Sequence, residues 1–148
     1  MAEGILKVLL PERLRDKVRV VSAGTLGLTA SPASVNAATV MEELGIDIGG
    51  HLSQALTAKL LSESHIVFAM AQEHIDFLRQ IRPELTERVF LLRTFDRQEE
   101  DPEESDIADP IGLDLNTYRV CRDLLIDEIV RILPRLIEMI DKYYRTRK

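Results

Sequence analysis

Hydrophobic positions along the chain follow two spacings, one typical of helices and the other typical of strands. Helical spacing near the start predicts a first helix, whose apolar face is formed by Ile5, Leu6, Val8, Leu9 and Leu10. Residues 11–17 are predicted to be a polar connection, and residues 18–24, rich in valine, predict a strand. A second helix is predicted next, with Ser31 as its cap, Pro32 in its first turn and Gly45 at its end.

The middle and the end of the chain continue this alternation. Residues 64–70 form a continuous apolar run of strand length, which is typical of a strand buried on both faces of a parallel sheet. After Gly112, helical spacing continues almost to the end of the chain, and Pro134 is expected to bend that helix without ending it. The other elements predicted are a short helix over 57–61 capped by Ser53 or Thr57, a helix over 72–82 and a strand over 88–92. Together they predict an α/β fold, a parallel sheet with helices on both faces and right-handed crossovers.

Composition places these elements in one acidic domain over residues 1–148. The chain is 45% hydrophobic and 30% charged with a formal charge of -6, which argues against a nucleic-acid partner. No apolar run approaches the roughly 20 residues needed to cross a bilayer, so no membrane interaction is expected. Cys121 is the single cysteine and there are three histidines, so neither an internal disulfide nor a Cys/His metal site is expected. We therefore expect a cytoplasmic protein without a metal or another cofactor.

Carboxylates crowd the segment between the last predicted strand and the long helix. They are Asp96, Glu99, Glu100, Asp101, Glu103, Glu104, Asp106 and Asp109. Their spacing does not fit a calcium-binding loop of the EF-hand type, because the turn glycine and the closing glutamate are absent. We interpret residues 99–106 as an exposed, solvated loop.

Asp109 is the best candidate in this segment for a proton donor. Pro110 fixes its own φ and pushes Asp109 toward extended geometry, so the carboxyl leaves the chain at a defined angle. A placed carboxyl is what general acid catalysis requires. The alternative is that Asp-Pro only begins a turn ahead of the long helix. Cys121 lies on the apolar stripe of that helix, so we interpret it as a buried core residue and not as a nucleophile.

Five segments in register resemble the low-molecular-weight protein-tyrosine phosphatase family. They are Met1-Ala2-Glu3-Gly4, Ser22-Ala23-Gly24-Thr25, the turn Gly45-Ile46-Asp47 followed by His51, the strand ending at Met70, and Asp109-Pro110 ahead of a long helix. The resemblance covers nearly the whole chain. It implies a flavodoxin-like parallel sheet with strand order 2-1-3-4.

The resemblance also implies a mechanism. In this family a Cys-x5-Arg-Ser/Thr loop binds the phosphate, and its thiolate attacks phosphorus to form a cysteinyl-phosphate. An aspartate followed by proline protonates the leaving oxygen and then activates water, and Asp109 matches that position. The chain begins at the family's Met-Ala-Glu, so the central first strand, the nucleophile and the loop arginine are expected before Met1. We therefore predict that residues 1–148 alone are inactive, as a shortened form of the enzyme or as a non-catalytic binding module.

The partner implied is a phosphorylated protein, and its modified side chain stays open. Tyrosine-selective members usually carry an aromatic residue where this chain has Ile111, so phosphotyrosine and phosphoarginine both remain candidates for the substrate. The disulfide relay of the related arsenate reductases is excluded by the single cysteine. Without the central strand its neighbours would present unpaired backbone groups, so a homo-oligomer is also expected if the chain is not simply truncated.

Overall fold

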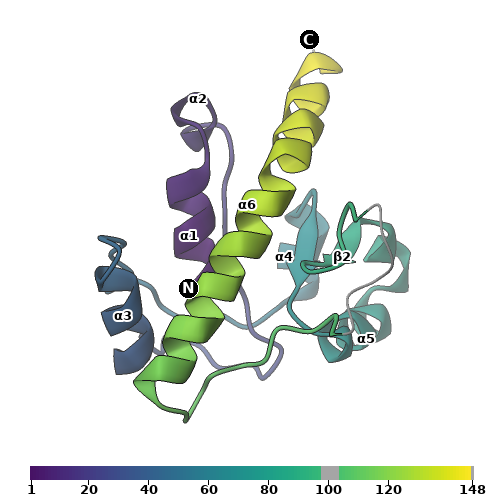
Figure 1. Cartoon of the computed structure of the whole chain (residues 1–148). Helices are drawn as coiled ribbons and strands as arrows, with labels where there is room; N and C mark the ends of the chain where they lie inside the picture. The colour runs from purple at the N-terminus through teal and green to yellow at the C-terminus, as the bar shows by residue number, and fades with distance from the viewer. Residues whose placement is uncertain (98–103, 148) are drawn as a thin grey trace.

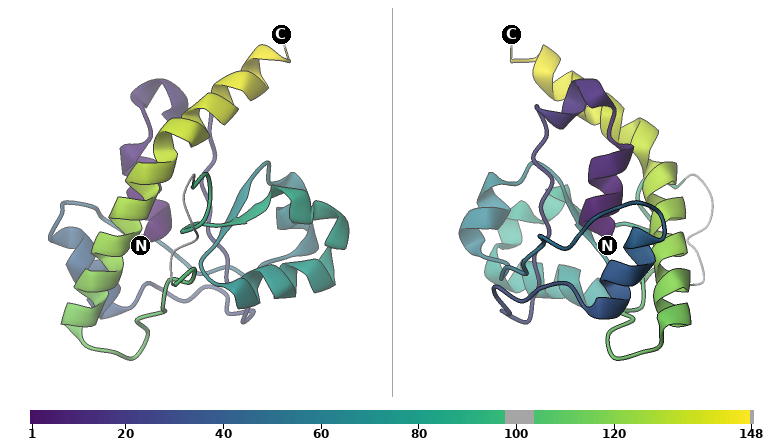
Figure 2. Two further views of the ribbon diagram at one scale, coloured as in Figure 1. Left: turned by 45° about the vertical axis from the view of Figure 1, so that its right-hand side comes forward. Right: turned by 90° about the vertical axis from the view of Figure 1, so that its left-hand side faces the viewer.

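The long helix α6, Leu115–Arg145, runs along the whole molecule and divides the other elements into two groups. In the computed structural model, which describes residues 1–97 and 104–147, helices α1 (Ala2–Leu9) and α3 (Val35–Glu42) pack against α6. The two strands with α4 and α5 lie on the other side of α6 (Figure 1). Figure 2 shows the start of α1 beside α6 and the last turns of α6 extending past the rest of the chain.

Helix α6 forms because its apolar residues recur at helical spacing and because its start is capped. The side chain of Asp114 accepts a hydrogen bond of 2.8 Å from the backbone N–H of Thr117. The helix continues through Pro134, as predicted, and buried residues on either side of the proline hold both halves to the core. The predicted bend itself stays a prediction. The buried face is formed by Tyr118, Cys121, Leu125, Ile129, Ile132 and Leu136.

A parallel pair of strands confirms the sheet type predicted from sequence. Strand β1, Val67–Ala69, pairs with β2, Val89–Leu91, in the register that aligns Val67 with Val89. Both strands are shorter than the predicted segments. The crossover between them contains α5, Gln72–Ile81, and a 3-10 helix, Pro83–Arg88. A small core of its own lies here, formed by Leu61, Ala69, Ile75, Leu78, Val89 and Leu91.

The strand predicted over residues 18–24 is wrong for the described part of the chain. Only Gly24 forms a bridge, with Ala55, through hydrogen bonds of 2.9 Å to Gln54 and Leu56. A β-strand needs a hydrogen-bonded neighbour, and among the described residues none pairs with positions 18–23. Valine-rich sequence favours extended backbone, but the neighbour decides whether it becomes a strand.

The polar connection predicted over residues 11–17 is also wrong, because it contains the short helix α2, Glu12–Arg15. Leu14 is 1% exposed, and its burial holds this turn against the rest of the chain. The guanidinium of Arg15 donates to the carbonyls of Val8 and Leu10, both at 3.0 Å. These carbonyls lie at the end of α1, where helical carbonyls lack partners, so α2 closes the end of α1.

The second helix begins three residues later than predicted. Ser34, and not Ser31, caps α3, because its hydroxyl accepts a hydrogen bond of 3.2 Å from the N–H of Ala37. Pro32 lies outside the helix, in a single bridge with Leu52. Helix α4, Ala58–Glu63, is capped by Thr57, one of the two residues predicted for it.

Replacing Ser34 with alanine is expected to lower the free energy of unfolding by at least about 1 kcal/mol, because the helix cap and the hydrogen bond of 3.0 Å to the Tyr118 hydroxyl are both lost. Ser31→Ala is the matched control. The bonds between residues 31 and 53 involve the backbone of Ser31, so this variant is expected to stay within about 0.5 kcal/mol of the unmodified chain. Urea unfolding of both variants measures the difference, and equal losses would restore Ser31 as the cap.

None of the helices in residues 1–97 and 104–147 combines the length and the apolar character that a membrane crossing requires.

Candidate functional site

The candidate site lies on the segment that enters α6, where residues 106–107 are tied to the carboxyl end of β1. The N–H of Ile107 donates to the carbonyl of Met70 at 2.7 Å. The carboxylate of Asp106 accepts from the N–H of Gln72 at 2.9 Å, at the start of α5. Ile107 is buried in the main core. Ligands of open α/β sheets bind at this end of the strands, so the segment lies where a site is expected.

Asp109 stands on a rigid turn two residues further on. Its carboxylate accepts a hydrogen bond of 3.0 Å from the N–H of Ile111, a short loop typical of aspartate in turns. Pro110 is buried, whereas Asp109 is exposed. The side chain is therefore held in place and is open to solvent, as a proton donor must be.

Cys121 lies beneath this turn and does not have the environment of a nucleophile. It is 8% exposed, and its thiol lies 3.8 Å from the carbonyl of Ala108. Burial raises the pKa of the Cys121 thiol, and the nearby negative charge of Asp109 raises the pKa further. A reactive cysteine needs the opposite, an accessible thiol with a lowered pKa. This geometry agrees with the prediction that Cys121 is a core residue.

The start of α1 packs against the main core, which contains Cys121, through the partly buried residues Met1 and Ala2. Among the described residues, no side chain caps the start of α1. A helix start carries a partial positive charge that favours an anion.

Three residues from separate segments meet at Glu3, a contact that sequence reasoning missed. The carboxylate of Glu3 accepts from the N–H and the hydroxyl of Ser22, at 2.8 and 2.7 Å. The imidazole Nδ1 of His51 lies 3.7 Å from the same carboxylate. Burial raises the pKa of the Glu3 carboxyl, but hydrogen bonds from Lys7 and Ser22 outweigh it, and the net pKa is lowered. The signal was present, because each residue belongs to a segment that carries the family resemblance.

A cavity of about 100 Å³ opens beside this contact. Its lining consists of Ser22, Ala23, Gly24, His51, Ser53 and Gln54. Gln54 donates to the carbonyl of Ser22 at 2.9 Å, so the lining is joined by hydrogen bonds. The hydrogen bonds between Glu3 and Ser22 hold the start of α1 to the segment ending at Gly24.

Ile111 is 70% exposed, and Leu113 on the same loop is 54% exposed. These two apolar side chains project from the turn that carries Asp109. An exposed apolar group beside a candidate catalytic carboxyl is suited to contact the apolar part of a substrate.

Of the acidic loop predicted over residues 99–106, residues 99–103 lie outside the described residues. Glu104 and Asp106 are both exposed. Within residues 1–97 and 104–147, no three His, Cys, Asp or Glu side chains are grouped in a way that could hold a metal ion.

Comparisons with known proteins agree on one family. The sequence profile for "Low molecular weight phosphotyrosine protein phosphatase" matches residues 1–143. A protein-arginine-phosphatase of Geobacillus stearothermophilus is 33% identical over 130 residues, which are 88% of this chain and 82% of the relative. A probable low-molecular-weight protein-tyrosine-phosphatase of Ralstonia nicotianae, EpsP, is 30% identical over 136 residues, covering 92% and 86% of the two chains.

Solved structures agree with this result. The YwlE arginine phosphatase of Geobacillus stearothermophilus superposes with a TM-score of 0.80 at 33% identity, covering 93% of this chain and 84% of that one. The AmsI tyrosine phosphatase of Erwinia amylovora superposes with a TM-score of 0.77 at 25% identity, covering 90% and 82%.

Proposed function

Because the chain belongs to the low-molecular-weight phosphotyrosine protein phosphatase family, we propose that Asp109 is the general acid and base of a phosphatase that hydrolyses a phosphomonoester or the P–N bond of phosphoarginine. In this reaction a cysteine thiolate attacks the phosphorus atom, and the bond to the substrate oxygen or nitrogen breaks. Asp109 donates its proton to the leaving group. It then accepts a proton from the water that hydrolyses the cysteinyl-phosphate, which restores the thiolate and releases phosphate.

One observation carries this proposal, which is the position of the Asp109 carboxyl. It is exposed, and it is held by the N–H of Ile111 at 3.0 Å. This placement matters because a general acid must lie within hydrogen-bond reach of the leaving atom.

Residues 1–148 contain Cys121 as their single cysteine and no Cys-x5-Arg segment. We therefore propose that this stretch alone does not turn over phosphomonoesters. Purified 1–148 is expected to hydrolyse p-nitrophenyl phosphate no faster than its own Asp109→Asn variant, because general acid catalysis cannot act without a nucleophile. A steady-state assay compares the two rates. A clear difference between them would reveal a nucleophile among these residues other than the one the family uses.

The substrate is proposed to be a phosphorylated protein side chain, with phosphotyrosine and phosphoarginine as the two candidates. Related proteins carry names of both activities. Ile111 offers an aliphatic surface, which can pack on the methylene groups of arginine and cannot stack on a phenol ring as an aromatic residue would. A chimera carrying the family's first strand and Cys-x5-Arg-Ser/Thr loop in front of Met1, assayed with peptides of each kind, separates the two.

The alternative is a non-catalytic pseudophosphatase that serves as a binding or regulatory module. It would use the acidic segment 99–106 or the basic end formed by Lys142, Arg145, Arg147 and Lys148. A solvated face explains the first and the helix dipole explains the second, so neither carries this proposal alone. Reading the coding sequence upstream of Met1 distinguishes the two. An in-frame Cys-x5-Arg-Ser-Pro supports the phosphatase, and an immediate stop codon supports the module.

Self-association and a cytoplasmic location stay predictions. Residues 18–23 are extended without a ladder partner among the described residues, and a groove of about 460 Å³ lies between them and α1. Unpaired extended backbone is a template for a strand from a second copy. Sedimentation of residues 1–148 is expected to show oligomers whose share rises with concentration. A monodisperse monomer that unfolds cooperatively would contradict this.

A further inference from the structure

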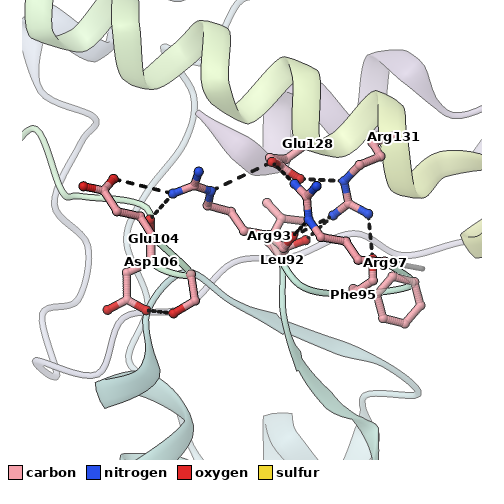
Figure 3. Close-up of polar contacts among 9 residues, drawn as sticks. Leu92, Arg93, Phe95, Arg97, Glu104, Asp106, Glu128 and Arg131 are labelled. Carbon is pink, nitrogen blue, oxygen red and sulfur yellow. Dashed lines mark hydrogen bonds and ion pairs between the residues drawn. The ribbon is translucent and has the colours of Figure 1, made fainter. Parts of the chain in front are cut away.

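A buried carboxylate on α6, Glu128, gathers three arginines around it (Figure 3). Glu128 is 6% exposed. Arg97 donates to one of its oxygens at 2.8 Å, and Arg131 donates to the other at 2.7 Å. The third arginine, Arg93, is more distant, with its Nε 3.9 Å from the carboxylate. The cluster joins α6 to the turn that follows β2.

Arg131 and Arg97 donate hydrogen bonds to the turn that follows β2. Arg131 donates to the carbonyl of Phe95 at 2.7 Å and to that of Leu92 at 2.9 Å. Arg97 bonds to the carbonyl of Arg93 and to Glu128. Among the described residues, neither of these arginines forms a hydrogen bond or ion pair with the segment that carries Asp109.

Arg93 differs because it reaches that segment. Its Nη1 donates to the carbonyl of Asp106 at 3.1 Å and lies 3.7 Å from the carboxylate of Glu104. Its Nε is buried and has no hydrogen-bond acceptor among the described residues. A planar guanidinium with Glu128 on one side and residues 104–106 on the other connects α6 to the entry of the Asp-Pro turn.

We propose that Arg93 is a positioning residue for Asp109, an inference that rests on the proposed role of Asp109. The carbonyl that Arg93 holds belongs to Asp106, whose own side chain accepts from Gln72. The next residue, Ile107, is bonded to Met70. The hydrogen bonds from Gln72 and to Met70 attach residues 106–107 to the start of α5 and the end of β1. Arg93 attaches them to the turn after β2 and to α6. The place of the Asp109 carboxyl therefore depends on a contact three residues away.

Both Arg93→Met and Arg97→Met remove a guanidinium that faces Glu128, so Arg97→Met is the matched control. In residues 1–148, Arg93→Met is expected to speed hydrogen exchange of the Ile107 and Ile111 amides about tenfold, the effect of losing one hydrogen bond to a charged group. Arg97→Met is expected to leave both amides unchanged. If Arg93→Met does not fold, Arg93→Lys is measured in its place, since it keeps the charge but cannot reproduce the guanidinium geometry.

A second measurement separates positioning from mere stability. In the chimera with a phosphate loop, Arg93→Met is expected to lower kcat on the order of 10²-fold with phenyl phosphate, because a small misplacement of a catalytic group has effects of that size. The loss is expected to be much smaller with p-nitrophenyl phosphate, whose more acidic phenol leaves with less help from an acid. KM is expected to change little.

The outcomes are distinguishable. Equal amide exchange in the Arg93 and Arg97 variants would overturn the positioning role and leave the role of Asp109 standing. The same would follow if Arg93→Met slowed both substrates equally. If Asp109→Asn has no effect in the chimera while Arg93→Met still loosens Ile107, the proposed acid is wrong and Arg93 is structural only.

Discussion

In a chimera that carries the family's phosphate loop, Asp109→Asn is expected to lower kcat for phenyl phosphate by roughly 10²–10⁴-fold, the usual contribution of a general acid. Asparagine keeps an oxygen that can accept the hydrogen bond of 3.0 Å from Ile111, so the turn is preserved and only the proton is lost. Steady-state kinetics with a series of aryl phosphates measures the effect. The loss is expected to grow as the leaving phenol becomes less acidic.

Asp106→Asn is the matched control for this variant. The Asp106 carboxylate accepts from Gln72 at 2.9 Å, and the amide oxygen of asparagine can accept the same bond. Its proton is not used in the proposed reaction, so kcat is expected to change by less than about threefold, in line with a surface substitution. A loss in Asp106→Asn as large as that in Asp109→Asn would mean that Asp109 is not the acid.

Replacing Glu128 with alanine is expected to give the largest loss of stability, about 3 kcal/mol. The change leaves three arginines close together without the buried carboxylate with which they pair. We expect the lower end of the range for broken buried ion pairs, because the side chains of Arg97 and Arg131 are 28% and 27% exposed and can recover part of their hydration. Urea unfolding, followed by circular dichroism, measures this loss.

Glu138→Ala is the control on the same helix. The side chain of Glu138 is 69% exposed and pairs with Arg135 one turn away, so its removal is expected to change stability by less than about 0.5 kcal/mol. A Glu128→Ala variant as stable as Glu138→Ala would mean that the three arginines turn to solvent at little cost. Such a result would also weaken the connection from α6 to residues 104–106.

The local sequence pattern was sufficient to predict those elements that form from residues close together in the chain. The spacing of apolar residues predicted α1, α5 and α6, since a helix satisfies its backbone within itself. The continuous run over residues 64–70 predicted a buried parallel strand, and β1 lies inside it. The turn at Asp109 was also local, because Pro110 restricts the residue before it.

Other features were decided only by tertiary structure, because their physical cause lies in distant residues. Residues 18–23 have the composition of a strand, but pairing needs a neighbour that composition cannot supply. Ser31 and Ser34 are equally good caps by type, and only the start of α3 shows which hydroxyl meets a free N–H. Glu128 and Arg131 lie one turn apart on α6, and their spacing in the sequence does not indicate burial. Burial against the turn after β2 makes Glu128 the centre of a cluster with Arg93 and Arg97, because a carboxylate removed from water must find its partners within the fold.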